Sequence, residues 1–183
     1  PYGFTVTAGS LPAGLNLALD GTLSGTPTAA NVAGATFTVT ATDAETVPGT
    51  REYTVVIDKA AQAISVAPLA DRVRTSGDFT VVATADSGLA VAFSSQTLGV
   101  CTVATDVVTM VTAGTCTIRA SQAGDANYNP APDVTGDVAI DPASQIITFG
   151  ALPNVPLSAG SVTVSATASS LLTVTFSSQT ALT

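Results

Sequence analysis

Short stretches in which apolar and polar residues alternate recur along the whole chain. Gly, Pro, Asn and Asp separate them, and these residues end strands and favour turns. Clear examples are FTVTA from Phe4, TFTVTATDA from Thr36, REYTVVID from Arg51 and FTVVATA from Phe79. Because successive side chains of a strand point to opposite faces, each stretch predicts a strand with one buried face. The chain is therefore expected to be all-β.

Part of this pattern occurs twice, at an offset of 83 residues. Residues 62–100 and 145–183 align without gaps and share 17 identities in 39 positions. The strand phase is preserved as well, so that Phe93 corresponds to Phe176. We expect the two copies to share one strand order, with both rings in equivalent core positions.

The stretch GSLPAGLNLALDGTLSGTPT, residues 9–28, breaks into very short extended pieces between Gly and Pro residues. The Asp20-Gly21 pair within it is typical of a hairpin turn. It predicts a type I′ turn, in which both central residues have positive φ.

The composition supports the prediction of strands and argues against several classes of binding partner. The residues are 46% hydrophobic and only 10% charged, without Trp. A net charge of −8 disfavours nucleic acid, because phosphate binding relies on clustered cations. The apolar runs fall short of the roughly 20 residues of a spanning helix, so no direct membrane insertion is expected in this segment. Any secretion signal is expected upstream of residue 1.

The motifs LPAGL, DGTLSGTP and FTVTATD closely resemble the Ig domain found in many copies in large bacterial surface proteins. The resemblance covers about residues 1–58. Residues 60–142 resemble a second bacterial Ig-like repeat, through CTV, GTCTI and QAGDANYNPA. Together these resemblances imply tandem immunoglobulin-like β-sandwich domains in an extended array, at an extracellular or bacterial cell-surface location, with no catalytic apparatus.

Three units follow from the resemblance and the repeat. Residues 1–59 form an Ig-like domain lacking its first strands, residues 60–142 a complete repeat, and residues 143–183 the N-terminal half of a second copy. Because a half-sandwich leaves its inward face uncovered, we expect the polypeptide to begin earlier and to continue further; strands from a neighbouring copy are the alternative. Short linkers, one restricted by Pro142, predict a fairly stiff rod.

The residue inventory argues against an enzyme. With no His, neither a Ser-His-Asp nor a Cys-His constellation can form within the chain, and His-based zinc sites are excluded. Two Cys alone cannot form a structural zinc site. A pair of acids is all that glycoside hydrolysis strictly needs, but the 13 acids are scattered at turns. We therefore predict no catalytic residues and no cofactor.

The two cysteines are the one chemical site that the sequence favours. Cys101 is in phase with Val103 and Cys116 with Ile118, so both thiols are expected to point inward. A structural disulfide is the preferred interpretation. A reduced buried pair is the alternative, and it suits a cytosolic protein.

Acids near strand ends leave a calcium site open. Asp43, Glu45 and Asp58 are expected near strand ends and domain junctions, where carboxylates can collect Ca²⁺. The sequence has no DxDxDG loop to supply the six to eight oxygens that calcium takes. Solvated turn acids are the alternative interpretation.

Tyr128, between Asn and Pro turn signals, is expected to play a structural role, with its hydroxyl fixing a loop; an exposed contact residue is the alternative. Tyr2 and Tyr53 are interpreted in the same way. An exposed row of these three rings would instead indicate sugar binding.

The sequence thus favours a non-enzymatic structural or adhesive stalk segment of a large secreted or cell-surface bacterial protein. A carbohydrate- or cell-wall-binding accessory module is one alternative, and a subunit of an extracellular filament or phage appendage is another. Expected partners are neighbouring domains of the same polypeptide, other copies of the chain, and host or surface glycans.

Overall fold

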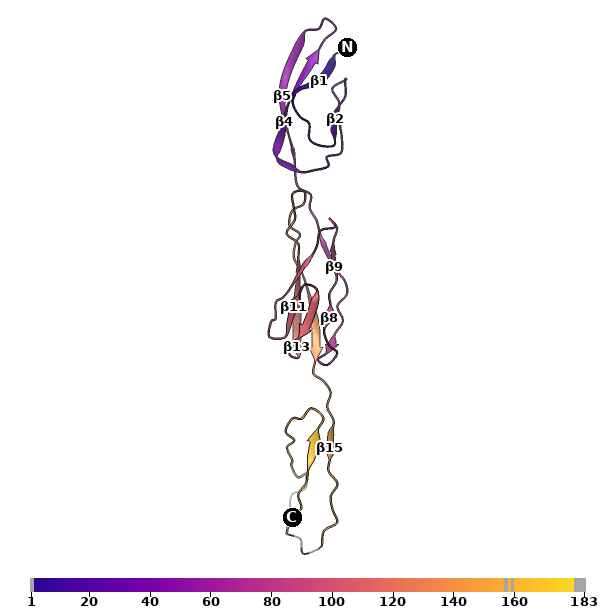
Figure 1. The fold of residues 1–183 in the computed structure, drawn as a ribbon, viewed down its shortest axis with the longest axis vertical. Helices are drawn as coiled ribbons and strands as arrows, with labels where there is room; N and C mark the ends of the chain where they lie inside the picture. The colour runs from indigo at the N-terminus through magenta and orange to yellow at the C-terminus, as the bar shows by residue number, and fades with distance from the viewer. Residues whose placement is uncertain (1, 157, 159, 180–183) are drawn as a thin grey trace.

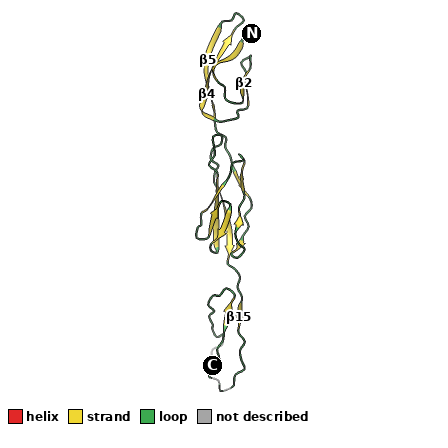
Figure 2. Ribbon diagram, viewed as in Figure 1, coloured by secondary structure: helices red, strands yellow, loops and turns green. Residues whose placement is uncertain are grey.

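The computed structural model describes residues 2–156, 158 and 160–179, and all regular elements among them are β-strands. The strands pair within three stretches that follow one another along the long axis of the molecule (Figure 1). We call residues 1–58 the first segment, 60–142 the middle segment and 143–183 the third segment. Strands and connecting loops alternate throughout, without a helix in the described part (Figure 2). The predicted all-β fold class is confirmed.

The first segment contains a sheet and a small hairpin. Its strands are β1 (Gly3–Gly9), β2 (Leu15–Leu17), β3 (Leu23–Gly25), β4 (Asn31–Thr42) and β5 (Pro48–Ile57). Strands β1, β4 and β5 form an antiparallel sheet in that order, and β2 pairs with β3. Phe37 on β4 is buried, with 4% of its surface exposed, and its ring stacks on that of Tyr53 on β5. This aromatic pair anchors the apolar side of the sheet.

The β2–β3 hairpin turns at the expected place but not as a type I′ turn. Gly21 has a φ of +87°, whereas Asp20 is not among the residues with positive φ. The Gly21 amide donates to the Ala18 carbonyl at 3.0 Å, and the Ala18 amide to the Thr22 carbonyl at 2.9 Å, which defines a three-residue loop. The Asp20 carboxylate accepts the Thr22 amide at 2.9 Å, and this bond lowers its pKa. The prediction of positive φ at Asp20 is wrong because the loop has three residues, and a loop of that length needs positive φ only at its last residue, Gly21.

The middle segment is a sandwich of short strands. Its elements are β6 (Ile64–Val66), β7 (Arg72–Val73), β8 (Phe79–Thr80), β9 (Ala83–Ala85), β10 (Ala92–Ser95), β11 (Cys101–Ala104), β12 (Val107–Met110), β13 (Gly114–Ser121) and β14 (Val134–Asp141). One sheet has the order β10-β13-β14-β7, a second has the order β11-β12-β8, and β6 pairs with β9. The segment thus has two larger sheets and one separate strand pair, and the apolar faces of the two larger sheets need a common core.

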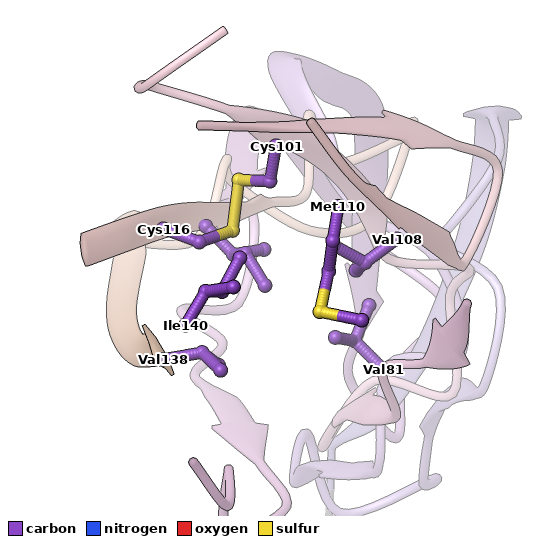
Figure 3. Packing of buried hydrophobic residues seen from close by; sticks show 8 residues of the cluster. Val81, Cys101, Val108, Met110, Cys116, Val138 and Ile140 are labelled. Atoms are coloured by element: carbon purple, nitrogen blue, oxygen red, sulfur yellow. A yellow bond between two sulfur atoms is a disulfide. The ribbon is translucent and has the colours of Figure 1, made fainter. Parts of the chain in front are cut away.

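A single buried cluster fills the space between these sheets (Figure 3). Its members are Val81, Cys101, Val108, Met110, Cys116, Ile118, Val138 and Ile140. Cys101 on β11 and Cys116 on β13 belong to different sheets, and a disulfide joins them with their Cα atoms 5.6 Å apart. Both are fully buried, in line with the strand phase of the sequence. The bond therefore links the two layers of the sandwich covalently.

The third segment repeats the first strand pair of the middle segment in register. Strand β15 (Ile147–Phe149) pairs antiparallel with β16 (Ala166–Ala168), as β6 pairs with β9. Each residue pair lies 83 positions after its counterpart: Ile64 faces Ala85 in one, and Ile147 faces Ala168 in the other. The internal repeat is therefore visible as repeated strand register.

Side-chain hydrogen bonds beside this strand pair repeat as well. The Ser87 hydroxyl donates to the Gln62 side-chain oxygen, and the Ser170 hydroxyl donates to that of Gln145 at the same offset. The same bond between residues 25 positions apart occurs once in each copy. The two copies therefore share a local fold as well as a similar composition.

The core position expected for Phe176 is not realised in the structure. Phe93 packs against the buried cluster of the middle segment, whereas 48% of Phe176 is exposed, and its ring meets Phe149 edge-on with centroids 6.3 Å apart. The physical reason is the missing cover. The residues that bury Phe93 come largely from β11–β14, and the described part of the third segment contains no counterparts of these strands.

One backbone position distinguishes the two copies. Gly88 has a φ of +76°, and its counterpart Leu171 has a φ of +62°. Both amides close the same turn, onto the carbonyls of Ala85 and Ala168 respectively. Since only glycine enters the left-handed region without a steric cost, Leu171 destabilises its turn relative to the middle copy.

We expect replacement of both cysteines by Ala to lower the free energy of unfolding of the middle segment by roughly 3 kcal/mol. The reason is that the cross-link closes a loop and so reduces the conformational entropy of the unfolded chain. Urea denaturation of the parent and of the C101A/C116A variant measures this difference. Added reductant should lower the stability of the parent alone. An unchanged unfolding midpoint in the variant would contradict a stabilising role.

We expect Leu171→Gly to stabilise the turn after β16 by about 1 kcal/mol, because it removes the left-handed strain from a side chain that is 94% exposed. Amide exchange of Ser169, which donates to the Ile146 carbonyl, should slow by about fivefold. The reverse substitution at the equivalent position, Gly88→Leu, should destabilise the middle segment. Faster exchange at Ser169 in the glycine variant would refute the strain argument.

Candidate functional site at the segment junction

The acids considered for calcium lie at opposite ends of the first segment. Asp43 and Glu45 occupy the β4–β5 turn, where the Asp43 carboxylate accepts the amides of Glu45 and Val47, each at 2.9 Å. Asp58 follows β5 at the other end of the sheet. The structure does not bring the three acids together, and among the described residues no group of three Cys, Asp or Glu could hold a metal ion.

The three tyrosines do not form a row on one surface. Tyr53 lies on β5, where its ring stacks on Phe37 and receives the Arg51 guanidinium 5.2 Å from its centroid. Tyr2 precedes β1, and Tyr128 belongs to a loop of the middle segment. The arrangement that would indicate sugar binding is therefore not the one observed.

The cysteines serve packing rather than reaction chemistry. Cys101 and Cys116 bond to each other and are fully buried. The Ser95 hydroxyl lies 3.3 Å from the Cys101 sulfur and also accepts the Thr97 amide at 3.1 Å. Neither sulfur is available as a thiolate nucleophile, so the site predicted from the two cysteines is a structural one.

The densest polar network at a segment boundary joins the linker after β5 to the loop 122–131. The Ala60 amide donates to the Asn127 carbonyl at 2.8 Å, and the Asn129 amide donates to the Ala60 carbonyl at 2.9 Å. The Lys59 ammonium donates to the Asp125 carbonyl at 2.6 Å, and the Asn129 side-chain amide to the Lys59 carbonyl at 3.2 Å. The linker is therefore held like an extra strand beside the loop.

The loop is shaped from within to present these groups. The Asp125 carboxylate accepts the amides of Asn127 and Tyr128 at 2.7 and 2.8 Å, an Asx turn that sets the loop backbone. Gly124 has a φ of +74°, and a Cβ there would lie 2.4 Å from the Tyr128 carbonyl oxygen, so only glycine fits. Tyr128 thus takes part through its backbone, which also bridges to Ala60 in parallel fashion.

Below the loop, a buried glutamine secures it to the sandwich. Gln62 is 5% exposed, and its side-chain amide donates to the Asn129 carbonyl at 2.7 Å and to the Gln122 side-chain oxygen at 2.5 Å. A buried amide with several partners is costly to disturb, because each lost partner leaves an unsatisfied polar group. The loop is consequently held by the start of the middle segment at Gln62 as well as by the linker.

One residue of the loop reaches the first segment directly. The Asn127 side-chain oxygen accepts the Ala30 amide at 2.9 Å, a bond between residues 97 positions apart. We call Lys59, Ala60, Asp125, Asn127 and Asn129 the junction clasp. Around it the structure has an open hollow of about 210 Å³, lined by Ala30, Asp58, Asn127 and neighbouring residues of both segments. The clasp therefore holds the linker and contacts both of the folded parts that the linker joins.

Sequence reasoning missed this clasp. The NYNP motif at Asn127 indicates a turn, and Asp125 is a typical turn residue, but neither signals a partner in the linker or in the first segment. Placing the loop against residues 59–60 requires the strand order of the whole sandwich, which the alternation pattern does not contain.

The described residues form no helix with the length and apolar character needed to cross a bilayer.

Comparison with solved structures gives distant similarities to multidomain segments of two other proteins. The crystal structure of domains 4 and 5 of the S-layer protein SbsC matches with 18% identity over 76% of this chain and 70% of that chain, at a TM-score of 0.33. The structure of SbsC domains 4–9 matches with 17% identity over 91% and 27%, also at 0.33. The protocadherin gammaB7 EC3–6 cis-dimer matches with 14% identity over 90% and 48%, at 0.36. At these TM-scores the likenesses carry no argument, so the fold rests on the chain's own strands.

Sequence comparisons separate the first segment from the rest. Curated proteins give no match. The resemblance of residues 60–142 to a second Ig-like repeat is supported here only by the repeated register and stays a prediction. The resemblance of the first segment is confirmed: residues 1–58 match the model of the family described as "Putative Ig domain".

Proposed function

We propose that this chain is a non-enzymatic structural segment of a large secreted or cell-surface bacterial protein, in which Ig-like units are held in line. The observation that carries the proposal is the junction clasp. A flexible tether between independent domains needs no side chain that spans the boundary, whereas Asn127 bonds to Ala30 and Lys59 bonds to the loop. This arrangement suits a spacer whose units keep a defined orientation.

The covalent link inside the middle segment supports an extracellular setting for this function. Disulfides persist in oxidising compartments and are rare in the cytosol. The bond between Cys101 and Cys116 lies inside the core and ties the two sheets, where a spacer domain benefits from resistance to unfolding. Residues 1–58 match a family of putative Ig domains, and the resemblance of their motifs to the Ig domain of large bacterial surface proteins points in the same direction.

An adhesive role would need a surface that recognises a partner. The tyrosines lie on separate elements, and the hollow at the junction is open, with three alanines among its lining residues. A stalk needs only folded units and ordered boundaries, so the stalk is the function proposed here. The partners we propose for it are the neighbouring folded units of the same polypeptide.

We expect Asn127→Ala to loosen the first segment from the middle segment without unfolding either one. Loss of one side-chain hydrogen bond costs roughly 0.5–1.5 kcal/mol, enough to populate other orientations of the two units. Residual dipolar couplings report this directly: amides of residues 1–58 and 60–142 should share one alignment tensor in the parent and require two different tensors in the variant.

The matched control is Asn16→Ala, at an exposed position of strand β2 in the first segment. It should leave a single tensor, as in the parent. Two tensors already in the parent chain would show that the units reorient freely, and the proposed spacer function would then be lost.

A further inference from the structure

The boundary between the middle and third segments contains the only Asp-Pro dipeptide of the sequence, Asp141-Pro142. Asp141 is the last residue of β14, and the described residues 142–146 belong to no regular element before β15 begins at Ile147. A single stretch of chain joins the two segments here (Figure 1), and residues 141–150 are all exposed. Hydrolysis of this one peptide bond would therefore separate the third segment from the rest of the chain.

The side chain of Asp141 is suited to attack this bond from within the same residue. Its carboxylate attacks the carbonyl carbon of Asp141 and closes a five-membered cyclic anhydride. The bond from that carbon to the Pro142 nitrogen breaks, and the nitrogen keeps the electron pair and takes up a proton. Water then opens the anhydride and leaves Asp141 with a C-terminal carboxyl group. A nucleophile held this close avoids the entropic cost of a bimolecular encounter.

Proline supplies the leaving group that this reaction needs. Its amide nitrogen is tertiary, with a ring carbon in place of the hydrogen atom. The added alkyl group makes the nitrogen more basic than that of an ordinary peptide bond, so it is protonated more readily as it leaves. Because the leaving nitrogen must take up a proton, mild acid is expected to accelerate the cleavage.

The fold adds a hydrogen-bond donor at the reacting carbonyl group. The Arg74 amide donates to the Asp141 carbonyl oxygen at 2.8 Å, and Asp141 pairs with Val73 of β7 in parallel register. Negative charge gathers on this oxygen when the carboxylate attacks, and a donor already in place stabilises that charge. The donor is in place only while β7 and β14 are paired, so the folded chain is expected to cleave faster than the unfolded one.

The charged groups around Asp141 leave its carboxylate free to react. Three of them lie on or beside β7: Asp71, Arg72 and Arg74. Their partners are, respectively, the Ala139 amide at 2.9 Å, the Phe79 ring with its centroid 4.9 Å away, and the Val111 carbonyl at 3.0 Å. On the other side, β13 ends its pairing with β14 at Gly114 and has no charged residue there. No ion pair among the described residues involves Asp141.

The first boundary provides an internal comparison. At the offset of 83 residues, Asp58 corresponds to Asp141 and Lys59 to Pro142. The nitrogen after Asp58 therefore belongs to an ordinary secondary amide, and the Lys59 ammonium donates to the Asp125 carbonyl at 2.6 Å within the junction clasp. The two boundaries share the aspartate and differ in the residue that determines the leaving group.

We propose that the Asp141–Pro142 bond is a self-cleavage site, assisted by the fold, that opens in mild acid and detaches the third segment. The Asp141 carboxylate is the nucleophile, the Arg74 amide is the donor at the carbonyl oxygen, and water is the co-reactant. This inference goes beyond the spacer function and does not depend on the junction clasp.

The test incubates the full 183-residue chain at neutral pH and at the lowest pH at which amide NMR spectra still show a folded middle segment. Intact mass spectrometry follows the reaction. We expect two fragments, residues 1–141 and 142–183, with PASQ at the start of the smaller one. Their rate of formation should be at least about tenfold higher in acid than at neutral pH.

Two variants of exposed residues separate the nucleophile from the leaving group. Asp141→Asn removes the carboxylate and Pro142→Ala removes the tertiary amide, and each should slow the cleavage at least about tenfold. The matched control Asp58→Asn, at the equivalent position of the first boundary, should leave the rate unchanged. The parent chain unfolded in urea at the same acidic pH should cleave at least about threefold more slowly than the folded chain.

Three results would overturn the proposal. One is a chain that stays intact in acid. Another is an Asp141→Asn variant that cleaves as fast as the parent, because a different nucleophile or a contaminating protease would then be responsible. The third is an equal rate in the folded and the unfolded chain, since the bond would then be labile through its dipeptide alone and the fold would contribute nothing.

Discussion

An apolar sheet face needs a cover, and this requirement explains most of what differs along the chain. In the middle segment the face formed by Val81 and Phe93 is closed by four strands and becomes a core. In the third segment the same residue pattern forms the same strand pair, yet its side chains stay exposed. Strand pairing is thus determined locally by alternation and turns, whereas burial is determined by whether the opposite layer is present.

The same distinction between strand pairing and burial explains which features could be predicted from the sequence. The offset of 83 residues correctly anticipated the shared strand register, because identical alternation and turn residues produce identical pairing. Strand phase also placed Cys101 and Cys116 in the interior. The burial of Phe176 was anticipated wrongly, since phase tells which face a ring occupies but not what lies across from it. The prediction for Asp20 failed for a related reason: the Asp-Gly dipeptide marks a turn but not its length, and the three-residue loop that forms needs positive φ only at Gly21.

The junction clasp lay outside the reach of sequence reasoning altogether. Its bonds join residues 59–60 to 125–129 and Ala30 to Asn127, and no periodic pattern encodes such pairs. These bonds form only because the strands between the linker and the loop fold into a sandwich that brings the loop back beside the linker. Polar contacts of this kind are specified by a few side chains with fixed geometry, in contrast to a core, which many apolar residues specify together.

The disulfide also has a consequence for the length of the molecule under tension. If the middle segment is pulled apart along the axis of the rod, the 15 residue steps from Cys101 to Cys116 cannot extend, because the covalent bond bypasses them. At 3.3–3.6 Å per extended residue, the end-to-end length of the stretched segment is about 50 Å shorter than it would be without the disulfide. A tether built from such units would lengthen in smaller increments, and each opened unit would keep two of its strands joined at a fixed point from which they can pair again.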